Sequence, residues 1–391
     1  MIRNKDAIET YRHKVRNWVE QVAIPNEARV AELNEVPADL VDDMQANDFF
    51  GWSIPEEYGG MGLTTEELVL MAFELSYCSV AFRARVGTNT GIGSESLVVD
   101  GTAEQKERFL PRLAKGEIVG CFALTEREAG SEATALTTSA VRDGDHYILN
   151  GSKAFITNAP ISDLFTVFAR TNANDPTHRG ISAFLVERGT PGLSTGDPYK
   201  MMGQSGSPVS EVYFDNVRVP AENLLGSQEG VGFKTAMKAL NKQRIHLSAL
   251  STGPAMRMLD EATKYSLERK QFNNPIGDFQ LVQAMLADSH TDIAAARALI
   301  LDTARKRDEG IDISLEASMC KYFATEMCGR VADRAVQIFG GSGYVADYSN
   351  IERFYRDVRL FRLYEGTSQI HQLNIARLTK NMVGDNGTVR K

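Results

Sequence analysis

Apolar residues recur at helical spacing in the first hundred or so residues and again after Gly232, with a differently patterned region between. In the first part, the run LVLMAFEL follows Thr64–Glu67, whose hydroxyl and acidic residues form a capping-type helix start. Another helix is expected after Thr102, and Pro111 inside its pattern predicts a break or a new start. These runs predict an N-terminal region of helices and loops.

The pattern changes near residue 119, where Val, Ile, Phe and Tyr become frequent and Gly and Pro interrupt the runs. Asp143 and Gly144 stand between two β-favouring runs, which is a strong hairpin signal. Further strands are expected at 165–170, 181–187 and 212–219. This region therefore predicts a small antiparallel β domain.

After Gly232 the chain becomes helical again. Ile293, Ala296, Ile300 and Ala304 fall on one helical face, and a second long run over 314–339 stops at a glycine pair. Long helices in succession favour a bundle.

The order helical, β, helical contains no βαβ alternation, which argues against Rossmann and barrel folds. The expected fold is mainly α with a central β domain. We expect an N-terminal helical domain at 1–118, a middle antiparallel β domain at 119–225 and a C-terminal helical bundle at 226–391.

Composition and charge exclude several classes of protein. The 391 residues carry 43 basic and 51 acidic side chains, for a net charge of −8, which is not the basic footprint of a nucleic-acid binder. No apolar stretch reaches the roughly 18 residues of a membrane span. The first residues show no signal or transit peptide, so a cytoplasmic location in a bacterium is expected.

Several chemical signatures are absent from the sequence. The four cysteines form no CxxC pair and the six histidines no HExxH, so no metal site is expected. The chain also lacks GxGxxG after a strand, GxxxxGK[ST] and GxSxG. These absences argue against nicotinamide binding, nucleotide hydrolysis and α/β-hydrolase chemistry.

The motifs that are present occur in one characteristic order. They are LTEREAGS at 124–131, FITN at 155–158, RKQF at 269–272, QIFGG at 337–341 and YEGTSQI at 364–370. In this order and spacing, over about residues 5–385, the chain resembles the acyl-CoA dehydrogenase family. The resemblance implies an N-terminal helical domain, a central β domain and a C-terminal four-helix bundle.

The resemblance also implies FAD-dependent α,β-dehydrogenation of an acyl-CoA to the trans-2-enoyl-CoA. An α C–H is a weak acid, so a base must be held against it. Glu365 matches the family's base, which takes the α-proton while a hydride passes from the β-carbon to FAD. Some members place the base at the position of Gln243, and a glutamine cannot accept a proton. For Glu365 alone, a solvated loop carboxylate is the alternative.

The same match implies contacts with the cofactor and the substrate. The isoalloxazine would meet Phe122, Leu124, Thr125, Ser131, Phe155 and Thr157. The pyrophosphate and adenosine, partly across a subunit interface, would meet Arg269, Phe272, Gln280, Gln337, Gly340, Gly341, Thr367 and Gln369. The substrate would meet Ser131, Asn241, Arg244 and Gly366.

The chain departs from the family pattern in several positions. Arg127 and Glu132 replace the usual Pro and Asp of LTEPxAGSD, Phe155 replaces the Trp of WITN, and Asn241 replaces a common Asp. Phenylalanine still covers a flavin but lacks the indole N–H. The Arg127 change puts in doubt the shape of this loop and its contact with an electron acceptor.

The segment 80–91 resembles the substrate-end segment of glutaryl-CoA dehydrogenase and bacterial dicarboxylyl-CoA dehydrogenases, in which an Arg at the position of Arg83 pairs with a distal carboxylate. A guanidinium suits a buried carboxylate, so a dicarboxylyl-CoA is one expected substrate. Ser76 stands where glutaryl-CoA dehydrogenases carry a Glu, which favours a longer, non-decarboxylated diacid. The alternative is that Arg83 and Arg85 are solvated charges at a helix end.

Three other functions stay open at this point. One is an acyl-CoA oxidase, although such enzymes usually carry an additional C-terminal domain. Another is a flavin enzyme acting on a nitroalkane or a carrier-bound acyl group, and the third is a non-catalytic CoA- or flavin-binding scaffold. The partners that the resemblance implies are an acyl-CoA, electron-transfer flavoprotein and the other subunits of a homotetramer.

Overall fold

The N-terminal part of the chain is helical, as predicted. The computed structural model describes residues 1–386 and 388; residues 387 and 389–391, at the end of the expected domain 226–391, lie outside the described residues. The helices of this part are α1 (Lys5–Trp18), α2 (Ile24–Leu33), α3 (Ala38–Ala46), α4 (Thr65–Leu75), α5 (Val80–Gly87), α6 (Gly93–Asp100) and α7 (Ala103–Ala114).

Capping interactions begin α4 and α7 where the sequence predicts them. Thr64 accepts a hydrogen bond from the Glu67 backbone N–H, and the Glu67 carboxylate accepts one from the Thr64 N–H. The break expected at Pro111 is wrong, because α7 continues through this residue to Ala114. Phe109 beside the proline is buried in the core, which holds this last turn in place.

The middle of the chain folds into one curled sheet. Its strands are β1 (Gly120–Ala123), β2 (Ser139–Asp143), β3 (His146–Thr157), β4 (Leu164–Arg170), β5 (Ile181–Glu187), β6 (Leu193–Thr195) and β7 (Val209–Pro220). The order is β1-β4-β2-β3-β7-β6, and β5 pairs with β4. The predicted hairpin joins β2 to β3, with Gly144 at φ 62° in its turn.

The sheet is mostly antiparallel, but β1 runs parallel to β4, and β2 touches β4 in parallel register at one pair. This differs from a purely antiparallel domain. A parallel pair needs a long connection, and the β2–β3 hairpin lies in the stretch between β1 and β4. Short-range sequence patterns predict the β2–β3 hairpin but not the parallel pairing of β1 with β4.

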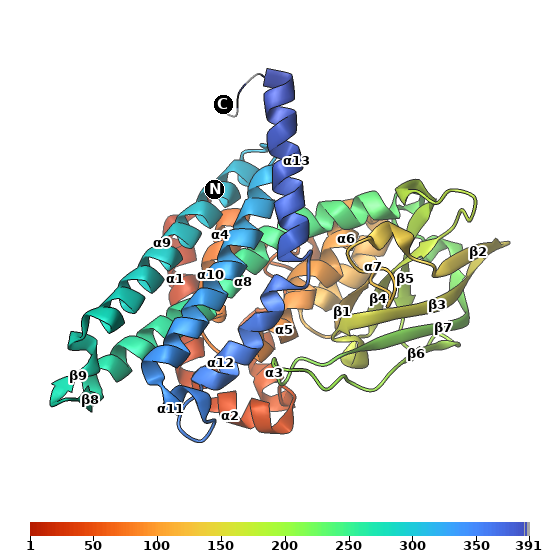
Figure 1. Cartoon of the computed structure of the whole chain (residues 1–391). Coiled ribbons are helices and arrows are strands. Elements are labelled where there is room, and N and C mark those ends of the chain that lie inside the picture. The colour runs from red at the N-terminus through yellow and green to blue at the C-terminus, as the bar shows by residue number, and fades with distance from the viewer. Residues whose placement is uncertain (387, 389–391) are drawn as a thin grey trace.

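Long helices form the C-terminal part. They are α8 (Gly232–Glu268), α9 (Gln280–Asp308), α10 (Ser314–Phe339), α11 (Gly341–Tyr344), α12 (Ile351–Val358) and α13 (Ser368–Asn386). In Figure 1, α8, α9 and α10 run side by side, and α13 stands against α10. The short hairpin of β8 (Lys270–Gln271) and β9 (Asn274–Pro275) lies at the end of the bundle far from the sheet. Among the described residues, no helix is long and apolar enough to span a membrane.

A shared apolar core joins the sheet to the helices. Phe109 and Leu113 of α7, Phe168 of β4, Ile181 of β5 and Leu240 of α8 belong to one buried cluster. The start of α8 is therefore fixed against the sheet, and this junction places side chains of α5 and α8 opposite those of β1 and β3.

Candidate active site

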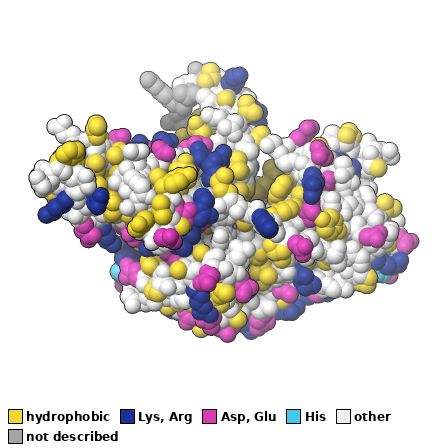
Figure 2. Space-filling view, turned by 60° about the horizontal axis from the view of Figure 1, so that its bottom comes forward, with side chains coloured by type: hydrophobic (Ala, Val, Ile, Leu, Met, Phe, Trp, Pro, Cys, Tyr) yellow, Lys and Arg dark blue, Asp and Glu magenta, His cyan; other side chains and the backbone are white. Residues whose placement is uncertain are grey.

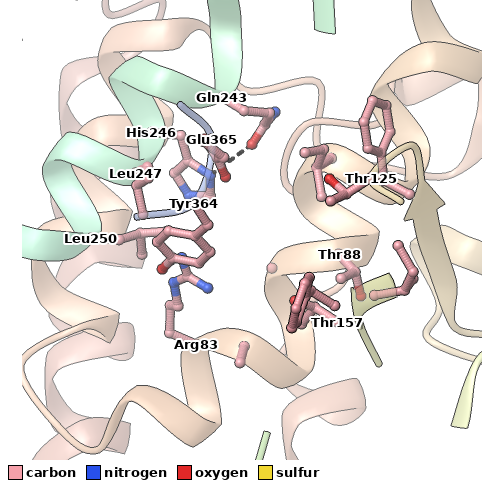
Figure 3. A pocket seen from close by; sticks show the side chains of 16 residues that line it. Arg83, Thr88, Thr125, Thr157, Gln243, His246, Leu247, Leu250, Tyr364 and Glu365 are labelled. Carbon is pink, nitrogen blue, oxygen red and sulfur yellow. Dashed lines mark hydrogen bonds between the residues drawn. The ribbon is translucent and has the colours of Figure 1, made fainter. Parts of the chain in front are cut away.

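A cavity lies where the sheet meets α5 and α8. The surface is hollowed where the helical part of the molecule meets the sheet, with hydrophobic side chains inside the hollow (Figure 2). The cavity wall formed by helices carries Arg83, Gln243, His246 and Tyr364 together with Glu365. The facing wall comes from the sheet, and open space separates the two in Figure 3.

Glu365 lies in the segment that leads into α13, in an unusual backbone conformation. Its φ is 54°, in the left-handed region that non-glycine residues rarely adopt, and Gly366 follows at φ 95°. The Oε2 atom is buried and has no hydrogen-bond partner among the described residues. Burial raises the pKa of this carboxyl, although Arg83, Lys321 and Arg244 oppose the rise. The carboxyl is thus an enclosed group rather than a solvated loop carboxylate.

Three side chains hold the backbone carbonyls beside this carboxyl. Lys321 Nζ donates to the Gly366 carbonyl at 2.6 Å, and His371 Nε2 lies 3.2 Å from the Glu365 carbonyl. Arg244 Nε donates to the same Glu365 carbonyl at 3.5 Å. A Cβ on Gly366 would lie 2.9 Å from His371 Nε2, so this close approach requires glycine.

Burial keeps His371 neutral in this arrangement. Both Lys321 and His371 are fully buried. Burial, helped by the charges of Arg244 and Lys321, lowers the pKa of His371 to about 3. Its Nε2 must then carry the proton in order to donate to the Glu365 carbonyl. The left-handed backbone at Glu365 is therefore stabilised by donors from α8, α10 and α13.

The sheet wall combines an aromatic ring with hydroxyl groups. Phe155 of β3 has a φ of 58° and its side chain is 62% exposed, a large exposure for a phenylalanine beside a cavity. Phe122 of β1 also lines this wall. The side chains of Thr125 and Thr157 lie on the same side, across the open space from Glu365 (Figure 3).

A buried ion pair supports the loop that carries Thr125. Lys153 Nζ donates to Glu126 Oε1 at 2.8 Å and to the Leu124 carbonyl at 3.2 Å. Thr138 donates to the same carboxylate from its N–H at 2.9 Å and from its hydroxyl. Burial alone would raise the pKa of Glu126, but Lys153 and these hydrogen bonds lower it to about 2. Burial lowers the pKa of Lys153 to about 8, against the opposing effect of Glu126.

Arg83 and Arg85 have different surroundings. The Arg83 side chain is buried, and its Nη2 donates to the Tyr364 hydroxyl at 2.8 Å. Its Nε is buried without a partner among the described residues. Arg85 does not line the cavity and instead packs over the Phe50 ring at 5.3 Å. The alternative of two solvated helix-end charges is therefore wrong for Arg83.

The other residues expected in a site are divided between two places. Leu124 is buried under the sheet wall and Ser131 is exposed on its loop. Arg244 donates to Asn241 Oδ1 at 2.7 Å, and Thr367 lies at the start of α13. A second group lies at the far end of the bundle, where one cavity is lined by Arg269, Gly340 and Gly341, while Phe272, Gln280 and Gln337 are exposed. Gln369 is exposed near the start of α13, close in sequence to Glu365. Within one chain, the far-end group does not join the cavity beside Glu365.

Sequence reasoning did not single out Lys321, His371, His246 or Tyr364. One signal was available for Lys321, because it falls on the helical stripe of Ala317, Ala324 and Cys328, where a charge is unexpected. His246 follows Gln243 by three residues on one helix and so shares its face. His371 gave no such signal, since its role depends on how α13 meets the Glu365 segment.

Comparison with known proteins assigns the family. Models of the acyl-CoA dehydrogenase N-terminal, middle and C-terminal domains match residues 5–117, 121–217 and 230–379. The chain belongs to the acyl-CoA dehydrogenase family. It is an oxidoreductase of a family whose members are FAD-dependent flavoproteins that act on CH–CH bonds of CoA thioesters.

Relatives show the same family along the whole chain. The chain is 44% identical to the 3-(aryl)acrylate reductase of Clostridium sporogenes, over 94% of this chain and 97% of that one. It is 40% identical to subunit CarC of the caffeyl-CoA reductase-Etf complex of Acetobacterium woodii, over 89% and 91%. The butyryl-CoA dehydrogenase structure from Megasphaera elsdenii superposes with a TM-score of 0.92 at 34% identity, covering 97% and 99%.

The residues of the sheet wall fit a flavin. An exposed aromatic ring at Phe155 and the hydroxyls of Thr125 and Thr157 suit a flat ring system with polar edges. On the facing wall, Glu365 lines the same cavity, and its Oε2 has no hydrogen-bond partner among the described residues. The cavity thus lies between the carboxyl and the wall that suits a ring system.

Proposed function

We propose that this protein interconverts an acyl-CoA and its trans-2-enoyl-CoA, with Glu365 exchanging the α-proton. The observation that carries the proposal is that Glu365 lines the cavity opposite the sheet wall, while its Oε2 is buried and has no hydrogen-bond partner among the described residues. The chain's own base is thereby held beside the space that an acyl group would occupy. When bound, FAD supplies the acceptor for the β-hydrogen and its electron pair.

Each step has a residue that supports it. The α C–H bond breaks, its proton moves to the Glu365 carboxylate, and its electron pair forms the double bond as the β-hydrogen leaves with its pair. Burial raises the pKa of Glu365, which makes the carboxylate a stronger base. Lys321 and His371 hold the neighbouring carbonyls, so the carboxylate has a fixed direction. Run in reverse, the same groups protonate the α-carbon of an enoyl-CoA.

An anaerobic titration tests the proposal. The purified yellow protein is titrated with saturated monoacyl- and diacyl-CoAs, and after reduction with 2-enoyl- and 3-arylacrylyl-CoAs. We expect a saturated thioester to bleach the flavin and an enoyl thioester to restore its colour. Oxygen uptake with turnover would instead favour an oxidase. A flavin that responds to no thioester would contradict the proposal and favour a binding scaffold.

Lys321 provides a test of how the pKa of Glu365 is set. Lys321→Met removes a cation that lowers this pKa, so the pKa rises further and the acidic limb of the kcat profile moves to higher pH. Burial lowers the pKa of Lys321 to about 8, so its charge is present in the acidic range where the limb is measured.

The control for this prediction is Lys321→Arg, which keeps a cation at the same position. We expect its acidic limb to stay closer to that of the unmodified protein than the limb of Lys321→Met. Profiles of kcat against pH, with flavin content measured for each variant, check the prediction. A limb that does not move in Lys321→Met would contradict it.

A dicarboxylyl-CoA is the substrate that Arg83 favours. The Arg83 guanidinium is buried at the cavity and its Nε lacks a partner among the described residues. A buried guanidinium needs an acceptor, and a terminal carboxylate supplies one. By their names, two of the relatives above are a 3-(aryl)acrylate reductase and a subunit of a caffeyl-CoA reductase complex, and an arylacrylyl-CoA is therefore the second candidate substrate.

Arg83→Met separates these substrates. We expect kcat/KM for a diacyl-CoA to fall at least tenfold more than kcat/KM for the monoacyl-CoA of equal length, because a charged hydrogen bond contributes roughly 1.5–3 kcal/mol. Arg83→Lys keeps a positive charge near Glu365 but loses the paired N–H donors of the planar guanidinium. Equal losses on both classes in Arg83→Met would contradict the diacid assignment.

We also propose that electron-transfer flavoprotein is the redox partner, because the related CarC subunit belongs to a complex with Etf by its name. The far-end cavity at Arg269, Gly340 and Gly341 supports a cofactor contact made by a second subunit, since it lies away from Glu365. A homotetramer of the chain would supply such contacts. The mass of the flavin-loaded protein in solution tests the assembly.

A further inference from the structure

A β-bulge in β3 presents the Phe155 ring on the sheet wall. The register of β3 against β7 shifts between Lys153 and Ile156. In this interval Ala154 and Phe155 together oppose one residue of β7, which is Glu211. A bulge of this kind bends its strand and re-aims a side chain, and the left-handed backbone of Phe155 belongs to it. The ring is largely exposed, so contacts outside the core must fix its position.

The carboxylate of Glu211 gathers three side chains beside the bulge. Arg127 Nε donates to Glu211 Oε1 at 2.6 Å, and the Tyr213 hydroxyl donates to Glu211 Oε2. The Tyr199 hydroxyl also interacts with this carboxylate. Hydrogen bonds from Tyr213 and Arg127 lower the pKa of Glu211, so the carboxylate keeps its charge at neutral pH.

Tyr199 connects this carboxylate to the Phe155 ring. The two rings lie against each other, with centroids 5.5 Å apart and planes inclined by 40°. The Tyr199 backbone N–H bonds the carbonyl of the first residue of β7 at 2.8 Å, which holds the tyrosine beside the strand. The bulge backbone is held separately, because the Ala154 N–H donates to the Thr125 carbonyl at 2.8 Å. The backbone and the ring of Phe155 therefore depend on different contacts.

Arg127 makes a contact that the residue usual at its position cannot make. It stands where a proline is common, and a proline side chain has no hydrogen-bond donor. The Arg127 side chain is largely exposed, whereas the Glu211 side chain is mostly covered. Water screens such an ion pair, so it contributes little to the stability of the fold. Its main effect is to fix the direction of the Glu211 carboxylate toward its tyrosine partners.

We propose that Arg127, Glu211 and Tyr199 are positioning residues for the flavin, which act by holding the Phe155 ring in place. The cavity beside Glu365 is lined by Phe155 but, among the described residues, by none of these three. They would therefore act on a bound flavin only through the ring. This inference rests on the part of the proposed function that places FAD on the sheet wall, and not on which thioester is turned over.

The affinity for flavin tests the proposal. Glu211→Leu should weaken flavin binding by about tenfold, because it removes a charged hydrogen-bond acceptor. Arg127→Met should weaken it by about two- to fivefold, the range of an exposed ion pair. Glu211→Gln keeps an acceptor for the tyrosines and should recover part of the affinity lost in Glu211→Leu. The measurement is the flavin released on dilution of the flavin-loaded protein, followed by the fluorescence of free flavin.

A second ion pair of β7 provides the matched control. Arg218 Nη1 lies 3.1 Å from Asp143 Oδ2, and both side chains are exposed. Arg218→Met removes a cation from the sheet surface, as Arg127→Met does, but Arg218 does not contact the Glu211 carboxylate. Its flavin affinity should equal that of the unmodified protein. Circular dichroism shows whether each variant is folded, and if Glu211→Leu does not fold, Arg127→Met and Glu211→Gln decide the test.

The Phe155→Ala background shows whether these residues act through the ring. Phe155→Ala alone should weaken flavin binding by about tenfold, because an aromatic ring stacked on a flat ring system is lost. Adding Glu211→Leu should then change the affinity by less than about twofold, since residues that act through one contact are not additive. A merely structural role would instead lower the affinity by the same factor in both backgrounds.

The possible failures are distinguishable. Unchanged flavin affinity in Glu211→Leu would overturn the proposal, as would a full further loss on top of Phe155→Ala. Unchanged affinity in Phe155→Ala would also overturn it, because the ring would then not touch the flavin. A protein that shows the expected flavin affinities but whose flavin responds to no CoA thioester contradicts the proposed function and leaves this inference supported.

Discussion

Glu365→Gln is expected to lower the turnover of every CoA thioester by about 10²- to 10⁴-fold, the range that a positioned general base contributes. The amide has nearly the same shape but cannot accept the α-proton. The surrounding donors bond the backbone carbonyls of Glu365 and Gly366, so the replacement should leave the segment in place. The measurement is the rate of flavin bleaching after anaerobic mixing with a saturated acyl-CoA.

Two further variants make this result specific. Glu365→Asp keeps the carboxylate but shortens the side chain by one methylene. The rate of flavin bleaching in this variant should lie between those of the unmodified protein and Glu365→Gln. In the double variant Glu365→Gln/Gln243→Glu, a carboxylate returns on the same helical wall of the cavity, at the position where some family members carry the base. Bleaching by Glu365→Gln at the unmodified rate would show that another group takes the proton.

Lys153→Met is expected to destabilise the fold by about 3–5 kcal/mol, because it leaves a buried carboxylate without its cation. Lys153 has no exposed surface and Glu126 is 7% exposed. The methionine fills much of the same volume, so the loss comes from the charge that remains on Glu126. Unfolding in urea, followed by circular dichroism on the flavin-loaded protein, measures the difference in the free energy of unfolding.

The double variant Glu126→Gln/Lys153→Met is the matched control. It removes the unpaired charge and keeps an amide near Thr137 and Thr138, which donate to Glu126 in the unmodified protein. Replacing both members of a buried ion pair is often far less costly than removing one. We therefore expect the double variant to regain most of the lost stability. A loss in Lys153→Met below about 1 kcal/mol would contradict the assignment.

The elements of the fold follow from local pattern to a large extent. The strands over 165–170, 181–187 and 212–219 and the long helices after Gly232 appear where apolar periodicity and β-favouring residues predict them. The parallel pairing of β1 with β4 does not follow, because register between strands more than 40 residues apart depends on how the sheet closes. The continuation of α7 through Pro111 depends on burial of its neighbours.

The candidate site, like the fold, could be predicted from the sequence only in part. The motif around Glu365 shows which carboxyl to consider, but nothing local predicts its left-handed φ or the three donors that hold the adjoining carbonyls. Those donors come from α8, α10 and α13, which meet only in the folded chain. The roles of His246 and Tyr364 at the cavity likewise depend on the distance between elements that are far apart in sequence.

The junction between sheet and helices has an evolutionary consequence. The residues that would face the acyl end belong to α5 and α8, whereas Phe122, Thr125, Phe155 and Thr157 belong to the sheet side. Because an apolar core fixes the start of α8 against the sheet, side chains that line the cavity can change without moving the two walls apart. Substrate range can therefore diverge among descendants of such a chain while the reaction itself is inherited unchanged.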